Sequence, residues 1–271
     1  MNKNNIILIP VYKQKISDYE EKSLRQCFNV LRKHTICLVT YEELNCDIYI
    51  SIAKEYNIKL LRENFSSSYF TNINGYNKML ISKSFYVRYK KYNYMLIYQL
   101  DAYVFYDALD EWCAQGFDYI GAPWFENYQS YEDGAKLWKV GNGGFSLRNI
   151  RKSINILSRI MPVFGFKKLW ELSCTRDLLH QCFYVLKSIF GWHNTMDYLV
   201  SQYVDQEDLF WTQYIPTLGI KMKIPTPKQA AAFSFERSPA YLYKLNNQEL
   251  PFGCHAWKKY DYDNFWSKYI N

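Results

Sequence analysis

Residues 94–101 read Tyr-Met-Leu-Ile-Tyr-Gln-Leu-Asp, a mainly apolar stretch that stops at a single carboxylate. Its length and its aromatic and branched side chains predict a strand over Tyr94–Leu100, buried on both faces. Such a strand has no use for a terminal carboxylate unless Asp101 caps a turn or contacts a ligand, and both interpretations stay open. In the second, Asp101 faces a ribose or a divalent ion holding a diphosphate, because hard cations take oxygen ligands.

The residues before this strand alternate short apolar runs with amphipathic stretches, which is typical of strand–helix units on a mostly parallel sheet. The pattern predicts further strands over Ile6–Val11, Thr35–Val39 and Ile58–Leu61. It predicts helices over Asp18–Arg32, Asp47–Tyr56 and Asn72–Tyr89. The sequence therefore predicts an α/β fold with a mostly parallel central sheet.

The ends of the predicted strands carry the first candidate site. In an open parallel sheet, ligands bind outside the carboxyl ends of the strands. Pro10-Val11-Tyr12 and Thr40-Tyr41-Glu42 follow two of the strands, and Asp101 ends a third. We therefore expect these segments to share one edge of the sheet and to form a single site.

The second half of the chain has a different pattern. It predicts a short strand over Asp118–Gly121, a polar and aromatic loop over Phe125–Lys139, and a glycine cluster over Val140–Arg148 that opens into a helix from Asn149. An aromatic-rich helical insertion is expected at about 161–204, followed by a short helix over Gln206–Tyr214. We expect one domain over 1–271, with one half at 1–105 and a second half at 106–271.

Composition narrows the class of protein. Aromatic residues make up 19% of the chain, with 26 Tyr, which suits ligands such as sugars and nucleobases, although an AT-rich codon bias would also favour Tyr. The net charge of +7 is spread out and favours an anionic donor or an anionic membrane. Nucleic acid is disfavoured, because no basic helix or recognition motif is present. Seven scattered cysteines without a Cys-x-x-Cys pair indicate reduced thiols and no structural zinc.

The apolar runs of the sequence bear on localisation. The first residues lack the apolar core and the cleavage site of a secretory signal. The sequence also contains no run of eighteen or more apolar residues, the length that a membrane-spanning helix requires. The densest run, Leu178–Trp192, contains His180, Gln181 and Lys187 and is predicted as a buried or interfacial helix. We therefore expect a cytoplasmic protein, with peripheral association at the inner face of the cell membrane as a further option.

Three other segments carry candidate chemistry. Three glycines in Gly141-Asn142-Gly143-Gly144 allow either a tight turn or a close approach to a ligand, and the spacing does not match a phosphate-binding loop. Glu207-Asp208 at a helix start is either a cap or a general base that the helix dipole keeps ionised. His255, in Pro251–Trp257, is either structural or a ligand for metal or diphosphate.

Taken in order, the motifs resemble a bacterial glycosyltransferase family found among surface-polysaccharide genes. They are Pro10-Val11-Tyr12, Tyr76–Ser82, Gln99-Leu100-Asp101, Asp118–Trp124, Gly141–Arg148, Glu207–Trp211 and Pro251–Trp257. The resemblance covers nearly the whole chain. It implies a GT-A-like nucleotide-binding fold, an Asp-x-Asp element that binds a metal-diphosphate, and a Glu-Asp pair that supplies the base of an inverting reaction.

This resemblance assigns expected roles. The donor, most simply a UDP-sugar, would contact Pro10, Val11, Tyr12, Tyr41, Asn77, Lys78, Gln99 and Asp101. The donor sugar and a saccharide or lipid-linked saccharide acceptor would contact Trp124, Asn142, Gly143 and Gly144. Asp208 would be the base, Glu207 would orient hydroxyls, and Asp101 with His255 would hold Mg²⁺ or Mn²⁺. The implied setting is capsule or O-antigen synthesis.

The sequence departs from the Asp-x-Asp pattern at one position, because Tyr103 stands where the second Asp is expected. Metal dependence is therefore left open. Two alternatives to a transferase also stay open: a non-catalytic nucleotide- or carbohydrate-binding protein on the same fold, and a sugar nucleotidyltransferase. The second would be expected to carry an early Gly-rich loop with Arg and Lys, which Ile6–Lys22 lacks.

Overall fold

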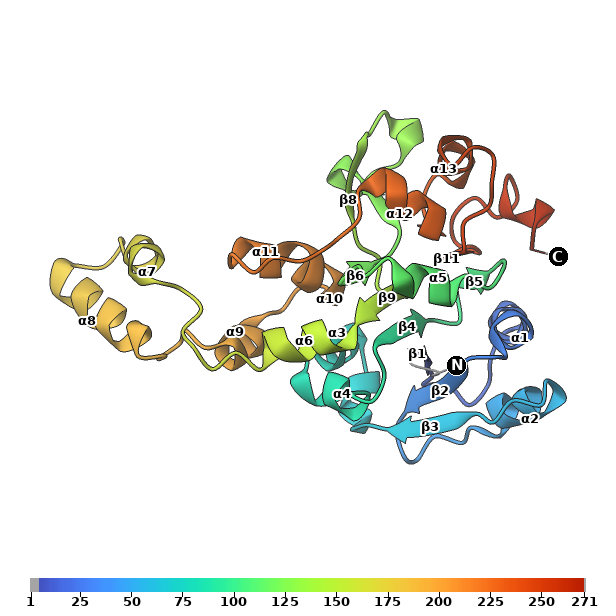
Figure 1. The fold of residues 1–271 in the computed structure, drawn as a ribbon, viewed down its shortest axis with the longest axis horizontal. Helices are drawn as coiled ribbons and strands as arrows, with labels where there is room; N and C mark the ends of the chain where they lie inside the picture. The colour runs from blue at the N-terminus through green and yellow to red at the C-terminus, as the bar shows by residue number, and fades with distance from the viewer. Residues whose placement is uncertain (1–4, 271) are drawn as a thin grey trace.

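The computed structural model describes residues 5–270 and is built on a six-stranded sheet (Figure 1). The strand order is β3-β2-β1-β4-β9-β6, with β1 (Asn5–Pro10), β2 (Thr35–Thr40), β3 (Leu61–Asn64), β4 (Tyr94–Tyr98), β6 (Tyr119–Ile120) and β9 (Phe145–Asn149). The first four strands in this order run parallel, whereas β9 is antiparallel to both of its neighbours. The predicted α/β fold with a mostly parallel sheet is confirmed.

Alternate residues of each central strand face opposite sides of the sheet, and each side has its own core. Ile7 and Ile9 of β1 face the layer that contains α1 (Asp18–Leu31), α2 (Asp47–Glu55) and α5 (Leu109–Ala114). Ile6 and Leu8 face the layer of α3 (Ile73–Leu80), α4 (Lys83–Arg88) and α6 (Ile150–Leu157). A strand covered on both faces needs apolar residues throughout, which explains the unbroken run at residues 94–98.

Two small sheets complete the second half of the chain. β5 (Tyr103–Val104) and β10 (Ser234–Phe235) flank β11 (Gly253–Cys254), while β7 (Pro123–Phe125) pairs with β8 (Leu137–Val140). The pairing of Cys254 with both Tyr103 and Phe235 brings the residues beside these strands together. This part of the chain also contains α12 (Pro227–Phe233) and α13 (Pro239–Leu245).

Several sequence-based element boundaries are wrong. The helix predicted over Asn72–Tyr89 is two helices, because Ser82 accepts a hydrogen bond from Phe85 N and starts α4. The strand predicted at Ile58–Leu61 lies at Leu61–Asn64, and the loop predicted at Phe125–Lys139 includes part of the β7–β8 hairpin. The glycine cluster at Val140–Arg148 ends in β9, and α6 starts directly after it with Asn149 as its cap.

The insertion expected at about 161–204 is helical, as predicted. It contains α7 (Phe166–Leu172), α8 (Leu178–Ile189) and α9 (Met196–Gln202), and α7 and α8 project away from the sheet (Figure 1). Of the two alternatives predicted for Leu178–Trp192, a buried or an interfacial helix, the buried one is wrong, since Leu178, Phe183 and Phe190 are all exposed. Within residues 5–270, none of the helices combines the length and apolar composition that crossing a bilayer requires.

Candidate active site

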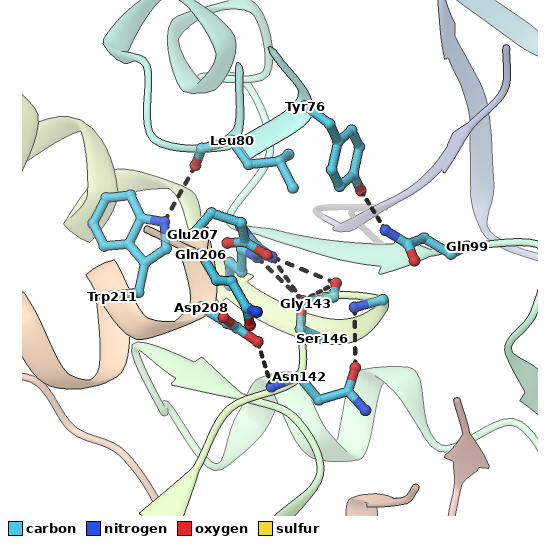
Figure 2. A network of polar contacts seen from close by, with 12 residues as sticks. Tyr76, Leu80, Gln99, Asn142, Gly143, Ser146, Gln206, Glu207, Asp208 and Trp211 are labelled. Atoms are coloured by element: carbon cyan, nitrogen blue, oxygen red, sulfur yellow. Dashed lines mark hydrogen bonds and ion pairs between the residues drawn. The ribbon is translucent and has the colours of Figure 1, made fainter. Parts of the chain in front are cut away.

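Two adjoining pockets open at the carboxyl ends of the parallel strands. The smaller has a volume of about 380 Å³ and the larger about 700 Å³. Ile73, Tyr76 and Gln99 line both, and the amide nitrogen of Gln99 donates to the Tyr76 hydroxyl at 3.0 Å. The hydrogen-bonded pair Tyr76 and Gln99 thus lies where the two pockets adjoin, and Figure 2 shows this contact.

The smaller pocket gathers most of the residues predicted to bind the nucleotide. Its lining includes Pro10, Val11, Tyr12, Gln99 and Asp101, together with Tyr49, Tyr69 and Phe70. Tyr41 does not line the smaller pocket. Its ring packs against the ring of Phe70, which does line the pocket, with ring centroids 5.5 Å apart. Lys78 lines neither pocket, since α3 presents it to solvent.

The larger pocket gathers the residues predicted to bind sugar and to catalyse transfer. Its lining includes Asn77, Trp124, Asn142, Gly143, Gly144, Glu207, Asp208 and His255. These residues come from α3, β7, the glycine loop, the start of α10 (Glu207–Leu209) and the segment after β11. Segments far apart in the sequence thus supply one cavity.

His255 lies between two carboxylates. Its Nε2 is 3.1 Å from Asp101 Oδ1 and 3.2 Å from Gln99 Oε1, and its Nδ1 is 3.2 Å from Glu236 Oε1. Burial disfavours the charged imidazole, but Asp101 and then Glu236 outweigh burial and raise the pKa of His255 to about 10. The pairing of β10 with β11 explains this contact, because Glu236 and His255 directly follow the paired residues Phe235 and Cys254.

Tyr103 lines neither of the two pockets. Tyr103, predicted to occupy the place of the second Asp, lies in β5 and packs against Phe105 and Trp257. Gln99, two residues before Asp101, is the side chain that shares the surroundings of Asp101 and His255.

Gln99, Asp101 and His255 would fit a divalent cation once the His255 imidazole had lost the proton that its raised pKa of about 10 keeps on it. An amide oxygen, a carboxylate oxygen and an imidazole nitrogen suit Mn²⁺ or Mg²⁺ when phosphate oxygens complete the coordination. Glu236 behind Nδ1 is the type of partner that fixes the orientation of a ligating histidine. Across residues 5–270, no group of three or more His, Cys, Asp or Glu side chains is arranged to hold a metal ion.

Glu207 is held by a buried arginine. Arg148 Nη2 donates to Glu207 Oε1 at 2.7 Å, and both side chains are almost fully buried. The guanidinium also contacts Ser146 Oγ and the Tyr86 hydroxyl. Glu207 Oε2 is buried with no hydrogen-bond partner in residues 5–270, and Glu207 lines the larger pocket. One carboxylate oxygen is thus held by Arg148, and the other is buried without a hydrogen-bond partner among the described residues.

Asp208 has the pKa of a base that works near neutral pH. Burial raises the pKa of this carboxyl, the charge of Glu207 raises it further, and together they bring it to about 7. The expectation that the helix start keeps Asp208 fully ionised is therefore wrong. Its Oδ2 accepts from Asn142 N at 3.0 Å and its Oδ1 from Leu209 N at 2.8 Å, which fixes the carboxylate (Figure 2).

The helical turn that follows Glu207 and Asp208 is fixed to α3 by a hydrogen bond from Trp211. After α10 the chain continues as a π-helix over Phe210–Tyr214 and then as α11 (Ile215–Thr217). The indole nitrogen of Trp211 donates to the Leu80 carbonyl of α3 at 3.2 Å, and the ring is buried (Figure 2). Irregular turns of this kind are frequent at functional sites.

The glycine cluster makes room for the side chains of Glu207 and His255. A Cβ on Gly143 would lie 1.8 Å from Glu207 Oε1, and a Cβ on Gly144 would lie 2.0 Å from His255 Nε2. Any larger residue would displace these groups. The close approach that the sequence predicted is therefore an approach to protein side chains, and it sets the position of both.

We expect Gly144→Ala to displace His255 and to lower stability by about 1 to 3 kcal/mol, the usual cost of overpacking. Gly165→Ala is the matched control, because a Cβ there meets nothing within 4 Å. Urea unfolding of both variants, with Mn²⁺ titration followed by melting temperature, measures the effect. Equal stability and equal Mn²⁺ response in the two variants would show that the close contact is not restrictive.

Sequence reasoning missed two residues of this site. Arg148 stood inside the glycine motif, and an arginine at the end of an apolar strand was a signal for a buried ion pair. No sequence pattern pointed to Glu236, because the strand β10 that precedes it has only two residues and its partner His255 lies 19 positions away.

The fold and the pockets define an α/β protein with a ligand site at the carboxyl edge of its sheet. The chain belongs to the family described as "Protein of unknown function (DUF5672)", whose model matches residues 59–255. That range includes Gln99, Asp101, Arg148, Glu207, Asp208 and His255. No curated protein sequence matches the chain.

Solved structures similar to this chain include three glycosyltransferases. The apo-form glycosyltransferase GlyE of Streptococcus pneumoniae is 13% identical, with a TM-score of 0.46 over 93% of this chain and 54% of that one. Mouse xyloside xylosyltransferase 1 is 10% identical, with a TM-score of 0.47 over 93% and 97%. Core-mannan synthase A of Aspergillus fumigatus, in a Mn/GDP form, is 8% identical, with a TM-score of 0.44 over 82% and 72%.

This chain thus spans about half the length of the GlyE chain it matches. The identities and TM-scores of all three likenesses are low.

Proposed function

We propose that this protein is a glycosyltransferase that moves a sugar from a nucleoside-diphosphate sugar to an acceptor hydroxyl with inversion. The observation that carries the proposal is the placement of Asp208. A buried carboxyl with a pKa of about 7 lines the larger pocket, and that pocket adjoins an aromatic pocket at Gln99 and Tyr76. Two ligands can therefore meet beside a base.

The smaller pocket suits the nucleoside. Rings of Tyr12, Tyr69 and Phe70 offer apolar faces against which a nucleobase can stack. Asp101 lies at the end of this pocket, where a ribose or the first phosphate would come. Lys259 and Arg237 line the larger pocket and offer positive charge to the diphosphate.

A divalent cation, when bound, would neutralise the departing diphosphate. Gln99, Asp101 and His255 are the residues that would hold it. Glu236 orients the imidazole from the other side of the ring.

Asp208 accepts the proton of the acceptor hydroxyl. As the acceptor oxygen bonds to the anomeric carbon, the bond from that carbon to the diphosphate oxygen breaks and the nucleoside diphosphate leaves. Attack from the face opposite the leaving group inverts the configuration. Glu207, fixed through one oxygen by Arg148, uses its other oxygen to accept a hydrogen bond from a sugar hydroxyl.

The biological setting follows from the sequence resemblance. We propose a GT-A-like enzyme with a UDP-sugar donor and a saccharide or lipid-linked saccharide acceptor, in bacterial capsule or O-antigen synthesis. The donor-binding half would be residues 1–105 and the acceptor half residues 106–271.

Binding of the donor is tested by a thermal-shift screen of nucleoside diphosphates with and without Mn²⁺. We expect one diphosphate to raise the melting temperature more strongly with Mn²⁺, because a ligand that binds only the folded state stabilises it. Asp101→Asn should weaken this shift, and His255→Ala should raise the Mn²⁺ concentration required. Shifts identical in wild type and both variants would remove Asp101 and His255 from the donor site.

A further inference from the structure

The helical hairpin formed by α7 and α8 has its apolar side outward. Of the large apolar side chains exposed in residues 5–270, more than half lie between Ile160 and Val204. On α8 and its C-cap, Leu179, Phe183, Leu186 and Phe190 are 67%, 57%, 57% and 83% exposed. Their spacing of four, three and four places them on one helix face, which we call the apolar stripe.

The face of α8 that packs against the protein is more polar than the apolar stripe. Its buried residues are Gln181, Val185 and Ser188. The amide of Gln181 donates to the Trp170 carbonyl of α7 at 3.0 Å, which joins the two helices. An ordinary surface helix has the opposite arrangement, so the apolar stripe requires a partner.

The charges around the apolar stripe indicate what the partner is. The hairpin contains only two carboxylates, Glu171 and Asp177, and these pair with Lys168 and His180. Lys167, Arg176 and Lys187 carry no carboxylate partner within the described residues. An apolar helix face flanked by uncompensated cations is complementary to an anionic lipid surface.

Aromatic and basic side chains also lie close together on this hairpin. The Arg176 guanidinium is 4.8 Å from the centroid of the Tyr184 ring, and Lys187 Nζ is 5.7 Å from the centroid of the Trp192 ring. Tyr and Trp beside cations are enriched where a protein meets the headgroup region. A second copy of this chain is the less favoured occupant, because two such faces would bring the same cations together.

We propose that the α7–α8 hairpin docks this protein on an anionic membrane surface, with the apolar stripe in the headgroup region. At twelve residues, α8 is too short to span the bilayer and would lie in its plane. The hairpin projects from the sheet that carries the pockets, so docking leaves them accessible (Figure 1). The proposal does not depend on sugar transfer.

Cosedimentation of the full chain with phosphatidylcholine vesicles, with and without phosphatidylglycerol, tests the docking. We expect binding to the anionic vesicles only, and a loss of at least about tenfold in Phe183→Gln/Leu186→Gln, because each side chain buries apolar area. Lys167→Gln/Lys187→Gln should weaken binding by about fivefold for each charge. Ile50→Gln, at an exposed apolar residue of α2, is the matched control and should bind like wild type.

Equal binding of wild type and Phe183→Gln/Leu186→Gln to anionic vesicles, or no binding by either, would overturn the proposal. Light scattering without lipid, which measures the oligomeric state, tests whether a second copy of this chain covers the apolar stripe instead. A wild-type dimer that becomes a monomer in Phe183→Gln/Leu186→Gln would assign the apolar stripe to a second copy. Nucleotide-induced thermal shifts in the same variants should equal those of wild type, which separates docking from the proposed activity.

Discussion

Asp208→Asn is expected to lower turnover by about 10² to 10⁴, the usual loss when a positioned general base is removed. The amide keeps the size of the side chain but cannot accept the proton of the acceptor hydroxyl. Donor affinity should stay near that of wild type, because the contacts of Asp208 are with Asn142 N and Leu209 N. Initial rates at saturating donor, with calorimetric donor binding, measure both quantities.

The pH dependence gives an internal control for this assignment. With a pKa of about 7, Asp208 is protonated at low pH, so the rate should rise with pH through about 7 and then level off. The carboxyl keeps its proton in the folded state above its ordinary pKa of 3.8. Its contribution to stability should therefore fall as pH rises from about 4 to about 7, and Asp208→Asn should lack this decline. Near-normal turnover in Asp208→Asn would exclude Asp208 as the base.

Arg148→Met is expected to cause the largest loss of stability, about 3 to 5 kcal/mol, because it leaves the Glu207 carboxylate buried without its cation. Both side chains of the pair are almost fully buried, and Glu207 Oε1 has Arg148 as its 2.7 Å donor. Urea unfolding at neutral pH measures the change.

The double variant Arg148→Met/Glu207→Met is the control for charge. Replacing both members of a buried ion pair by apolar residues is often tolerated, so most of the lost stability should return. Activity should not return, because Glu207 is also expected to bind a sugar hydroxyl. A single variant as stable as wild type would show that the ion pair is not needed to hold Glu207.

The positions of most helices and strands in the first hundred residues could be predicted from the sequence, because these elements follow a regular strand–helix pattern. β1, α1, β2 and α2 lie within one residue of their predicted positions. The error at Asn72–Tyr89 arose because apolar spacing of three and four continues across the break, while Ser82 and its cap interrupt the backbone. The spacing of apolar residues alone does not show where a helix N-cap such as Ser82 divides one helix from the next.

The second half was less readable because its decisive strands are short or irregular. β5, β10 and β11 have two residues each, too few to show alternation, yet they bring Glu236 and His255 together. β9 was not predicted, because the glycines directly before it indicated a turn and not a strand. These glycines signalled a close approach, but only coordinates could show that its targets are Glu207 and His255.

The candidate site was predicted better from motifs than from elements. Asp101, Asn142, Glu207, Asp208 and His255 all line the two pockets. Two other predicted residues lie outside the pockets: the Tyr41 ring packs against Phe70, and Lys78 lies on the solvent side of α3. The pKa of Asp208 depends on burial, which no sequence pattern reports.

The central claim, sugar transfer from an activated donor, is tested most directly by incubating the protein with nucleoside-diphosphate sugars and following nucleoside diphosphate release and product configuration by NMR. We predict slow release from one donor without acceptor, loss of release in Asp208→Asn, and a product whose anomeric configuration is opposite to that of the donor. A product that retains the configuration, or release that is equal in wild type and Asp208→Asn, would contradict the account.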